Sequence, residues 1–140
     1  VAVASKVEGL SYDNFYGAQF WGRVAYHDFE GVTTDIGEQE RLVKSFGRAQ
    51  VLILRNHGLL VTGPSIPETF MESWSLQRAC EVQLAAASIP GPNVRIPEGV
   101  LEAIPAQRKP MQAGHVRPYQ PVFDAMLRVH GIRLEELAAA

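Results

Sequence analysis

Two unbroken apolar runs separated by four residues constrain the fold more than any other feature. Residues 51–54 (VLIL) and 59–62 (LLVT) are joined by the tight connection Arg55-Asn56-His57-Gly58. A short run that is apolar at every position is typical of a strand covered on both faces. Asn56 and Gly58 both tolerate the positive φ that a tight reversal requires. The sequence therefore predicts an antiparallel hairpin in the middle of a sheet.

Helix signals follow this hairpin. Ser65-Ile66-Pro67-Glu68 combines a capping serine, an early proline and a reciprocal glutamate, which together mark a helix start. The helix is expected to run to about Ala87, because Pro90 and Pro92 end it. Its apolar residues spread around more than one stripe, so something besides its own sheet must cover it.

The segment before the hairpin predicts a strand and a shorter helix. Residues 22–26 are the strand candidate, and the acidic turn 27–31 follows it. Asp35 is the expected cap of a helix that ends at Gly47, with Glu38 reaching back to complete a capping box. Its expected apolar face consists of Ile36, Leu42, Val43 and Phe46.

The sequences at both ends of the chain predict additional helices. Residues 1–9 are typical of the back half of a helix that stops at Gly9, and the absence of capping groups leads us to expect that residues upstream of Val1 belong to the same domain. Residues 90–121 hold seven of the nine prolines and predict an extended connector with a short helical turn near 98–104. A last helix follows Pro121 and stops at Gly131. The element order predicts an α/β fold with helices on a mixed or largely antiparallel sheet.

Composition excludes several classes of protein. The 140 residues are 46% apolar and carry a net charge of −2. The chain therefore lacks the excess of positive charge that proteins use to bind nucleic acid or an anionic membrane. No apolar run approaches the roughly 18 residues of a membrane span. The single cysteine, Cys80, excludes an internal disulfide framework. We expect a soluble, cytoplasmic-type protein.

His57 is the strongest candidate for a functional side chain. It lies at the bend of the predicted hairpin, where rigid strands on both sides can aim an imidazole at a divalent metal. The alternative is a turn histidine that hydrogen-bonds its own loop. A catalytic zinc needs about three protein ligands, and although His27 beside Asp28 and Glu30 could converge with His57, no spacing requires it. Taken alone, the chain does not complete a metal site.

The remaining reactive side chains predict no second site. His130 precedes a glycine helix stop, His115 lies in the proline-rich stretch, and Cys80 sits among apolar helix neighbours as a core thiol would. The serines flanking Trp74 lie within a predicted helix and not in the G-x-S-x-G turn that presents a nucleophilic serine. The sequence has no glycine-rich loop of the kind that binds phosphate. No catalytic or substrate-binding residue is therefore assigned.

Several separated blocks resemble one known family. Residues 52–63 (LILRNHGLLVTG), with 68–70 (ETF) and 78–83 (RACEVQ), are similar to the class II aldolase/adducin family, and 6–10 (KVEGL) and 22–31 (GRVAYHDFEG) continue the pattern in order. The resemblance covers about two-thirds of the chain. It implies a three-layer α/β/α domain with a mostly antiparallel sheet (an AraD-like class II aldolase fold), here incomplete and spanning 1–140.

The resemblance also implies a chemistry. Enzymes of this family resemble zinc-dependent lyases and epimerases, usually tetrameric, that act on small hydroxy-carbonyl sugars or their phosphates through a metal-stabilised enediolate. It makes His57 the third metal ligand, while the other two come from an H-x-H motif expected just before Val1, and the acid/base glutamate from further upstream. Glu30 and Tyr26 are weak candidates for supporting contacts.

Two hypotheses follow. In the first, the chain is part of a metal-dependent aldolase-type lyase that is inactive as this fragment. In the second, it is an adducin-like interaction or oligomerisation module without metal chemistry. The histidine of the Arg55–Gly58 block favours the lyase, because a pure interaction module has no need for it.

Overall fold

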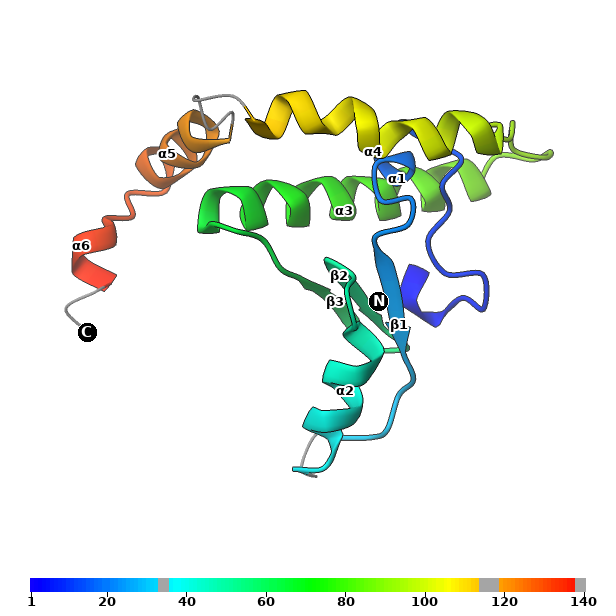
Figure 1. Cartoon of the computed structure of the whole chain (residues 1–140), viewed down its shortest axis with the longest axis horizontal. Helices are drawn as coiled ribbons and strands as arrows, with labels where there is room; N and C mark the ends of the chain where they lie inside the picture. The colour runs from blue at the N-terminus through cyan, green and yellow to red at the C-terminus, as the bar shows by residue number, and fades with distance from the viewer. Residues whose placement is uncertain (33–35, 114–118, 138–140) are drawn as a thin grey trace.

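A computed structural model describes the chain except for residues 33–35, 114–118 and 138–140. In chain order, the described elements are η1 (Val3–Ser5), α1 (Phe15–Ala18), β1 (Val24–His27), α2 (Glu38–Phe46), β2 (Val51–Leu54), β3 (Gly58–Val61), α3 (Ile66–Ala87), α4 (Glu98–Ala113), α5 (Gln120–Val129) and α6 (Leu134–Leu137). Figure 1 shows α3 and α4 on one side of the strands and α2 on the other. The expected α/β class is confirmed.

The sheet of the described chain has three strands in the order β1-β2-β3. β2 and β3 form the predicted antiparallel hairpin, with Leu54 paired to Gly58. Only β2 is interior, because β3 lies half-buried at the edge of the described sheet. β1 pairs with β2 in parallel, so that His27 lies opposite Leu54. The sheet is therefore mixed, and the end of β1 and the hairpin turn lie at the same edge.

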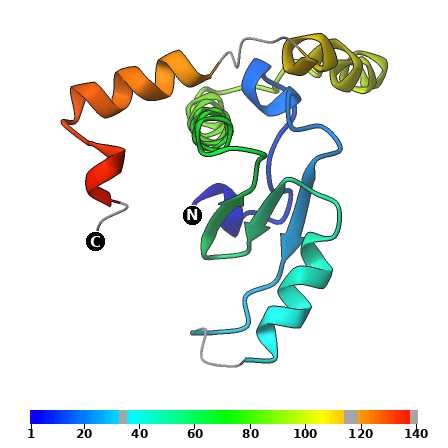
Figure 2. The same cartoon turned by 60° about the vertical axis from the view of Figure 1, so that its left-hand side comes forward.

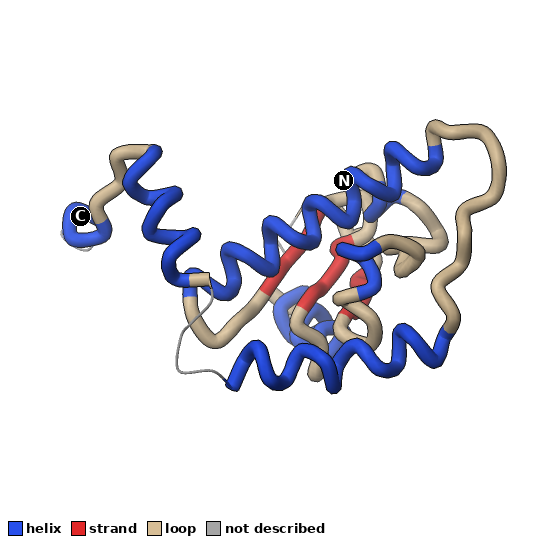
Figure 3. Tube along the Cα trace, turned by 90° about the horizontal axis from the view of Figure 1, so that it is seen from above, coloured by secondary structure: helices blue, strands red, loops and turns tan. Residues whose placement is uncertain are grey.

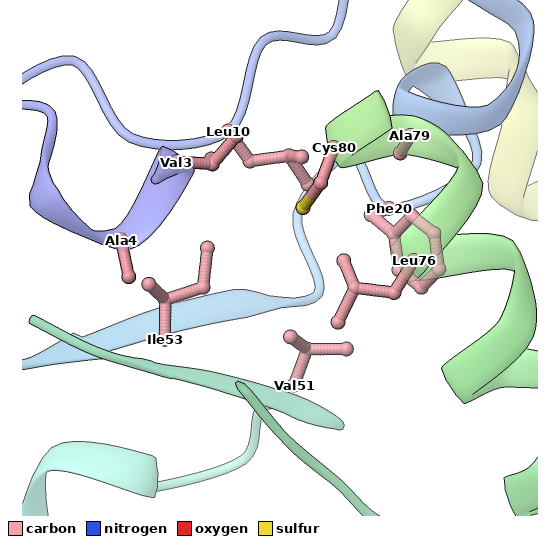
Figure 4. Close-up of a cluster of buried hydrophobic side chains, with 9 residues drawn as sticks. All are labelled: Val3, Ala4, Leu10, Phe20, Val51, Ile53, Leu76, Ala79 and Cys80. Atoms are coloured by element: carbon pink, nitrogen blue, oxygen red, sulfur yellow. The ribbon is translucent and has the colours of Figure 1, made fainter. Parts of the chain in front are cut away.

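Helices cover both faces of this sheet, as Figure 2 shows. Val51 and Ile53 of β2 are fully buried and join a core that includes Leu76 and Cys80 of α3, drawn in Figure 4. Because side chains alternate along a strand, the equally buried Leu52 points to the other face, where α2 packs on β1 and β2. The prediction that residues 51–54 form an interior strand is confirmed.

The longest helix begins and ends as predicted. The Ser65 side chain accepts a hydrogen bond from the Glu68 amide and donates one to the Glu68 carboxylate at 2.9 Å. α3 then runs to Ala87 and contacts α1, β3 and α5. α5 and α6 lie to one side of the sheet, beyond the start of α3, as Figures 1 and 3 show.

The helix predicted at the N-terminus does not form. Residues 1–9 form one 3₁₀ turn at Val3–Ser5, followed by a second turn that the Gly9 amide closes on the Lys6 carbonyl at 3.0 Å, instead of a helix that stops at Gly9. Gly9 does adopt a positive φ of 69°. A side chain there would collide with the Tyr26 ring, so this glycine lets the segment pass close to β1.

The start of α2 also differs from the prediction. Its N-cap is Gly37, without a side-chain cap hydrogen bond, and Glu38 is the first helical residue. The predicted cap, Asp35, lies outside the described residues. Glu38 points to His27 of β1 instead of serving a capping box. The helix stops at Gly47 as expected, but Ile36 and Val43, which were assigned to its apolar face, are exposed.

α4 is longer than the short turn predicted for 98–104, because it continues to Ala113 through Pro105 and Pro110. Each proline removes one helical N–H, but tertiary contacts offset the loss. Leu101 is buried, and Arg108 donates to the Glu72 carboxylate of α3 and to the Gln19 carbonyl. Proline spacing alone does not reveal such anchoring.

Candidate metal-ligand site at the hairpin turn

The hairpin turn presents His57 at the edge of the sheet. The His57 amide donates to the Leu54 carbonyl at 3.1 Å, which closes the turn. Asn56 takes a positive φ of 57°, as predicted, whereas Gly58 does not. The His57 side chain is exposed. Within the described chain its ring takes part in no side-chain hydrogen bond.

Arg55 fixes this turn to the rest of the fold. Its amide donates to the His27 carbonyl at 2.8 Å, and the Asn56 amide donates to the Ala4 carbonyl at 3.2 Å. The Arg55 guanidinium lies 4.2 Å from the centre of the Tyr26 ring and donates to the carbonyls of Lys6 and Val7. A side chain on so constrained a backbone loses little further entropy when it binds a ligand.

His57 lines a cavity of about 180 Å³ at the shared edge of β1 and β2. His27, Glu30, Glu38 and Arg55 are among the residues on its walls. The structure therefore brings His27 and His57 to one cavity, although their sequence spacing does not require it. The turn histidine faces this cavity and solvent, and not the aliphatic core.

A metal held by His57 would need ligands beyond those described. Three His, Cys, Asp or Glu ligand atoms gather at one place in the described chain, and they belong to His27, Glu30 and Glu38. His57 fits a divalent cation as a single donor, because its imidazole is accessible, rigidly placed and uncommitted. It remains a predicted ligand, and one of an incomplete set.

Tyr26 and Glu30 have structural contacts that account for them. The Tyr26 hydroxyl accepts a hydrogen bond from the Leu10 amide at 3.0 Å, and the ring lies under Arg55. The Glu30 carboxylate accepts from Arg41 Nε at 2.8 and 3.1 Å. Tyr26 therefore holds the N-terminal segment on β1, while Glu30 also reaches the His27 ring at 3.7 Å.

The other reactive groups lie away from this cavity. Cys80 is buried in the core, as predicted, and burial raises the pKa of its thiol. Ser73 donates to the Thr69 carbonyl of its own helix at 2.7 Å. His130 caps the C-terminal end of α5, and His115 lies outside the described residues.

The contact between Glu38 and His27 has no signal in the sequence. Glu38 is 9% exposed, and its carboxylate lies 4.0 Å from Nε2 of His27. The two residues are eleven positions apart, with a strand end, a loop and a helix start between them. Only the packing of α2 on β1 brings them together.

Comparisons with known proteins agree with this architecture. The family model for the class II aldolase and adducin N-terminal domain matches residues 1–84. A Caulobacter vibrioides protein named "Putative aldolase class 2 protein" is 36% identical over 108 residues, which is 76% of this chain and 42% of that protein. Rat alpha-adducin is 45% identical over 74 residues, which is 51% of this chain and 10% of adducin.

Solved structures extend the likeness to three dimensions. The crystal structure of an aldolase II superfamily protein from Pseudomonas syringae has a TM-score of 0.77 and 35% identity, and the match covers 91% of this chain and 50% of that one. L-fuculose 1-phosphate aldolase from Glaciozyma antarctica has a TM-score of 0.65 at 23% identity, over 93% of this chain and 48% of the aldolase. The second match shows likeness of fold.

The chain belongs to the class II aldolase and adducin family. It spans about half or less of the length of the relatives it matches. Among the described helices, none is both long and apolar enough to cross a membrane.

Proposed function

We propose that this chain is part of a metal-dependent lyase of the class II aldolase type, in which His57 is one of the metal ligands. The observation that carries the proposal is the placement of His57, on a fixed hairpin turn and open to a cavity. Family membership supports it. The expected substrate is a small hydroxy-carbonyl sugar or sugar phosphate, cleaved by retro-aldol chemistry or epimerised.

When bound, a zinc or similar divalent ion supplies a Lewis acid that stabilises negative charge developing on the substrate. The role of His57 is to hold that ion through a neutral imidazole, and Arg55 keeps the turn in place. The two further imidazoles are expected from an H-x-H sequence that precedes Val1 in the full-length protein, and the proton-transferring carboxylate from further upstream. This chain contributes no assigned catalytic residue.

The proposed complete domain is larger than the described sheet. We expect a three-layer α/β/α domain with a mostly antiparallel central sheet, in which 1–140 is one part and 90–121 connects to the C-terminal helix. A homo-oligomer, a tetramer by family resemblance, is the expected assembly. The Pseudomonas syringae match, which covers half of that chain, supports a complete domain larger than residues 1–140.

The test uses the full-length protein that contains this chain. Zinc-loaded wild type is expected to cleave or epimerise a member of a hydroxy-carbonyl sugar phosphate panel. His57→Ala is expected to reduce bound zinc and activity together. The exposed His130→Ala, far from the turn, is the matched control and should leave both unchanged. Stoichiometric zinc and full activity in His57→Ala would contradict the proposal.

A second candidate function rests on the alpha-adducin match at 45% identity. In that case the chain is a non-catalytic interaction or oligomerisation module. Persistent inactivity of the zinc-loaded full-length protein across the substrate panel, with intact self-association, would favour the module.

A further inference from the structure

The described chain has two buried polar or charged residues, His27 at 5% exposure and Glu38 at 9%. They come from different elements, the end of β1 and the start of α2, and they face each other. Burying a carboxylate beside an imidazole is costly unless both groups have partners. The partners of the His27 imidazole and the Glu38 carboxylate therefore indicate which ligand this part of the cavity could bind.

Within the described ranges, one ring nitrogen of His27 has a hydrogen-bond partner and the other has none. Nδ1 lies 3.0 Å from the hydroxyl of Ser45 in α2, within hydrogen-bond distance. Nε2 is buried and has no hydrogen-bond partner among the residues that the structure describes. It points between two carboxylates, with Glu30 Oε1 at 3.7 Å and Glu38 Oε1 at 4.0 Å. Both distances exceed the limit for a hydrogen bond.

We propose that His27, Glu30 and Glu38 form a second divalent-cation site, with Nε2 of His27 and one oxygen of each carboxylate as ligands. The three ligand atoms lie within 4.8 Å of one another. Ligands about 2.1 Å from a tetrahedral zinc ion are separated by about 3.4 Å. The observed spacings are therefore slightly larger than those around a bound ion, and modest side-chain rotation closes the difference.

The surrounding contacts prepare this site for a cation. The Ser45 hydroxyl can accept a hydrogen bond from a protonated Nδ1. That tautomer leaves the Nε2 lone pair free to ligate a metal, as hydrogen-bond partners of metal-bound histidines do. The Arg41 guanidinium holds the Glu30 carboxylate near the site through hydrogen bonds from Nε to both carboxylate oxygens. Asp28, Glu30 and Glu38 bring three negative charges to the region, against the positive charges of Arg41 and Arg55.

The donor set indicates the kind of ion. One imidazole with two carboxylates suits zinc or manganese better than calcium or magnesium, which prefer oxygen ligands alone. The three side chains also line the cavity of about 180 Å³, so a fourth position can hold water or a small ligand. The inference does not depend on the proposed lyase activity or on His57 as a ligand.

Metal binding to the chelator-treated chain tests the proposal in a His57→Ala background, which removes the other candidate ligand. Calorimetry with Zn²⁺ is expected to show one site per chain. Glu38→Gln and His27→Gln should each weaken binding by at least about tenfold. Asp28→Asn, which changes a cavity carboxylate outside the ligand set, is the matched control and should bind Zn²⁺ as its parent does.

A second measurement does not depend on the folding of these buried variants. In the His57→Ala chain labelled with ¹⁵N-histidine, saturating Zn²⁺ should shift the Nε2 resonance of His27 to that of a metal-bound, unprotonated nitrogen, while Mg²⁺ should leave it unchanged. A proton retained on Nε2 at saturating Zn²⁺ would overturn the site. So would undetectable Zn²⁺ binding to a folded His57→Ala chain, or unchanged Zn²⁺ affinity in folded Glu38→Gln.

Discussion

At the scale of the residue, Asn56 decides how the hairpin turn presents His57. Its φ of 57° lies in the left-handed region, which costs most L-residues roughly 1–2 kcal/mol and β-branched residues more. Asn56→Val is therefore expected to lower the free energy of unfolding by about 1–2 kcal/mol, measured by urea denaturation. Asn56→Gly is the control, because glycine accepts this φ without strain. Equal midpoints for the two variants would contradict the argument.

The titration of Tyr12 is expected to lower the free energy of unfolding at alkaline pH. Burial, and secondarily the neighbouring Tyr26, raises the pKa of Tyr12 to about 12 from the ordinary 10. Below pH 10 the phenol is neutral in both folded and unfolded chains. Between pH 10 and 12 the unfolded chain loses the proton first, so the Tyr12 contribution to stability falls as the pH rises.

The expected result is a steeper alkaline loss of stability in wild type than in Tyr12→Phe. Unfolding free energies at pH 8 to 11.5 measure it, and the difference between the two proteins removes the titration of lysines and other tyrosines. Parallel pH profiles would show that the Tyr12 phenol titrates in the same way in the folded and unfolded chains.

At the scale of the element, α3 depends on its first turn. Ser65 satisfies the Glu68 amide and holds the Glu68 carboxylate, and an N-cap of this kind contributes about 1 kcal/mol. Ser65→Ala should lower the unfolding free energy by about that amount in urea denaturation. Ser88→Ala, at the exposed C-cap of the same helix, changes the same atoms without removing an N-cap and should cost less. A larger effect at Ser88 would refute the capping argument.

The elements that the sequence predicts well are those whose signals are local. The run 51–54, the turn residue Asn56 and the Ser65 cap each act over a few neighbours, and the structure confirms all three. The proline spacing predicts a helix shorter than the observed α4, because Leu101 and Arg108 stabilise α4 through contacts with distant residues. Likewise, Glu38 was assigned to a local cap, whereas its partner is His27 on another element.

The same distinction separates the two candidate ligand sites. His57 was predicted from a contiguous block of sequence, because the turn that aims it is formed by its own neighbours. The His27, Glu30 and Glu38 group exists only because α2 packs against β1. No periodicity or spacing in the sequence encodes that contact, so only the structure reveals it.

At the scale of the whole molecule, α3 presents apolar side chains that the described chain does not cover. Leu76, Ala79 and Cys80 face the core, while Trp74 and Leu84 are each 45% exposed and Val82 is 36% exposed. These exposed positions lie on other sides of the same helix, as expected from its broad apolar distribution. Apolar surface of this kind is typical of a protein interface.

We therefore expect the chain to self-associate at micromolar concentration, as measured by sedimentation velocity. Leu84→Glu should shift the protein toward monomer, because burying a leucine contributes about 1.5–3 kcal/mol and a buried charge opposes association. Val94→Glu is the matched control: it adds the same charge at a valine that is 89% exposed between α3 and α4. A monomeric wild type, or equal dissociation of both variants, would show that α3 is not the contact surface.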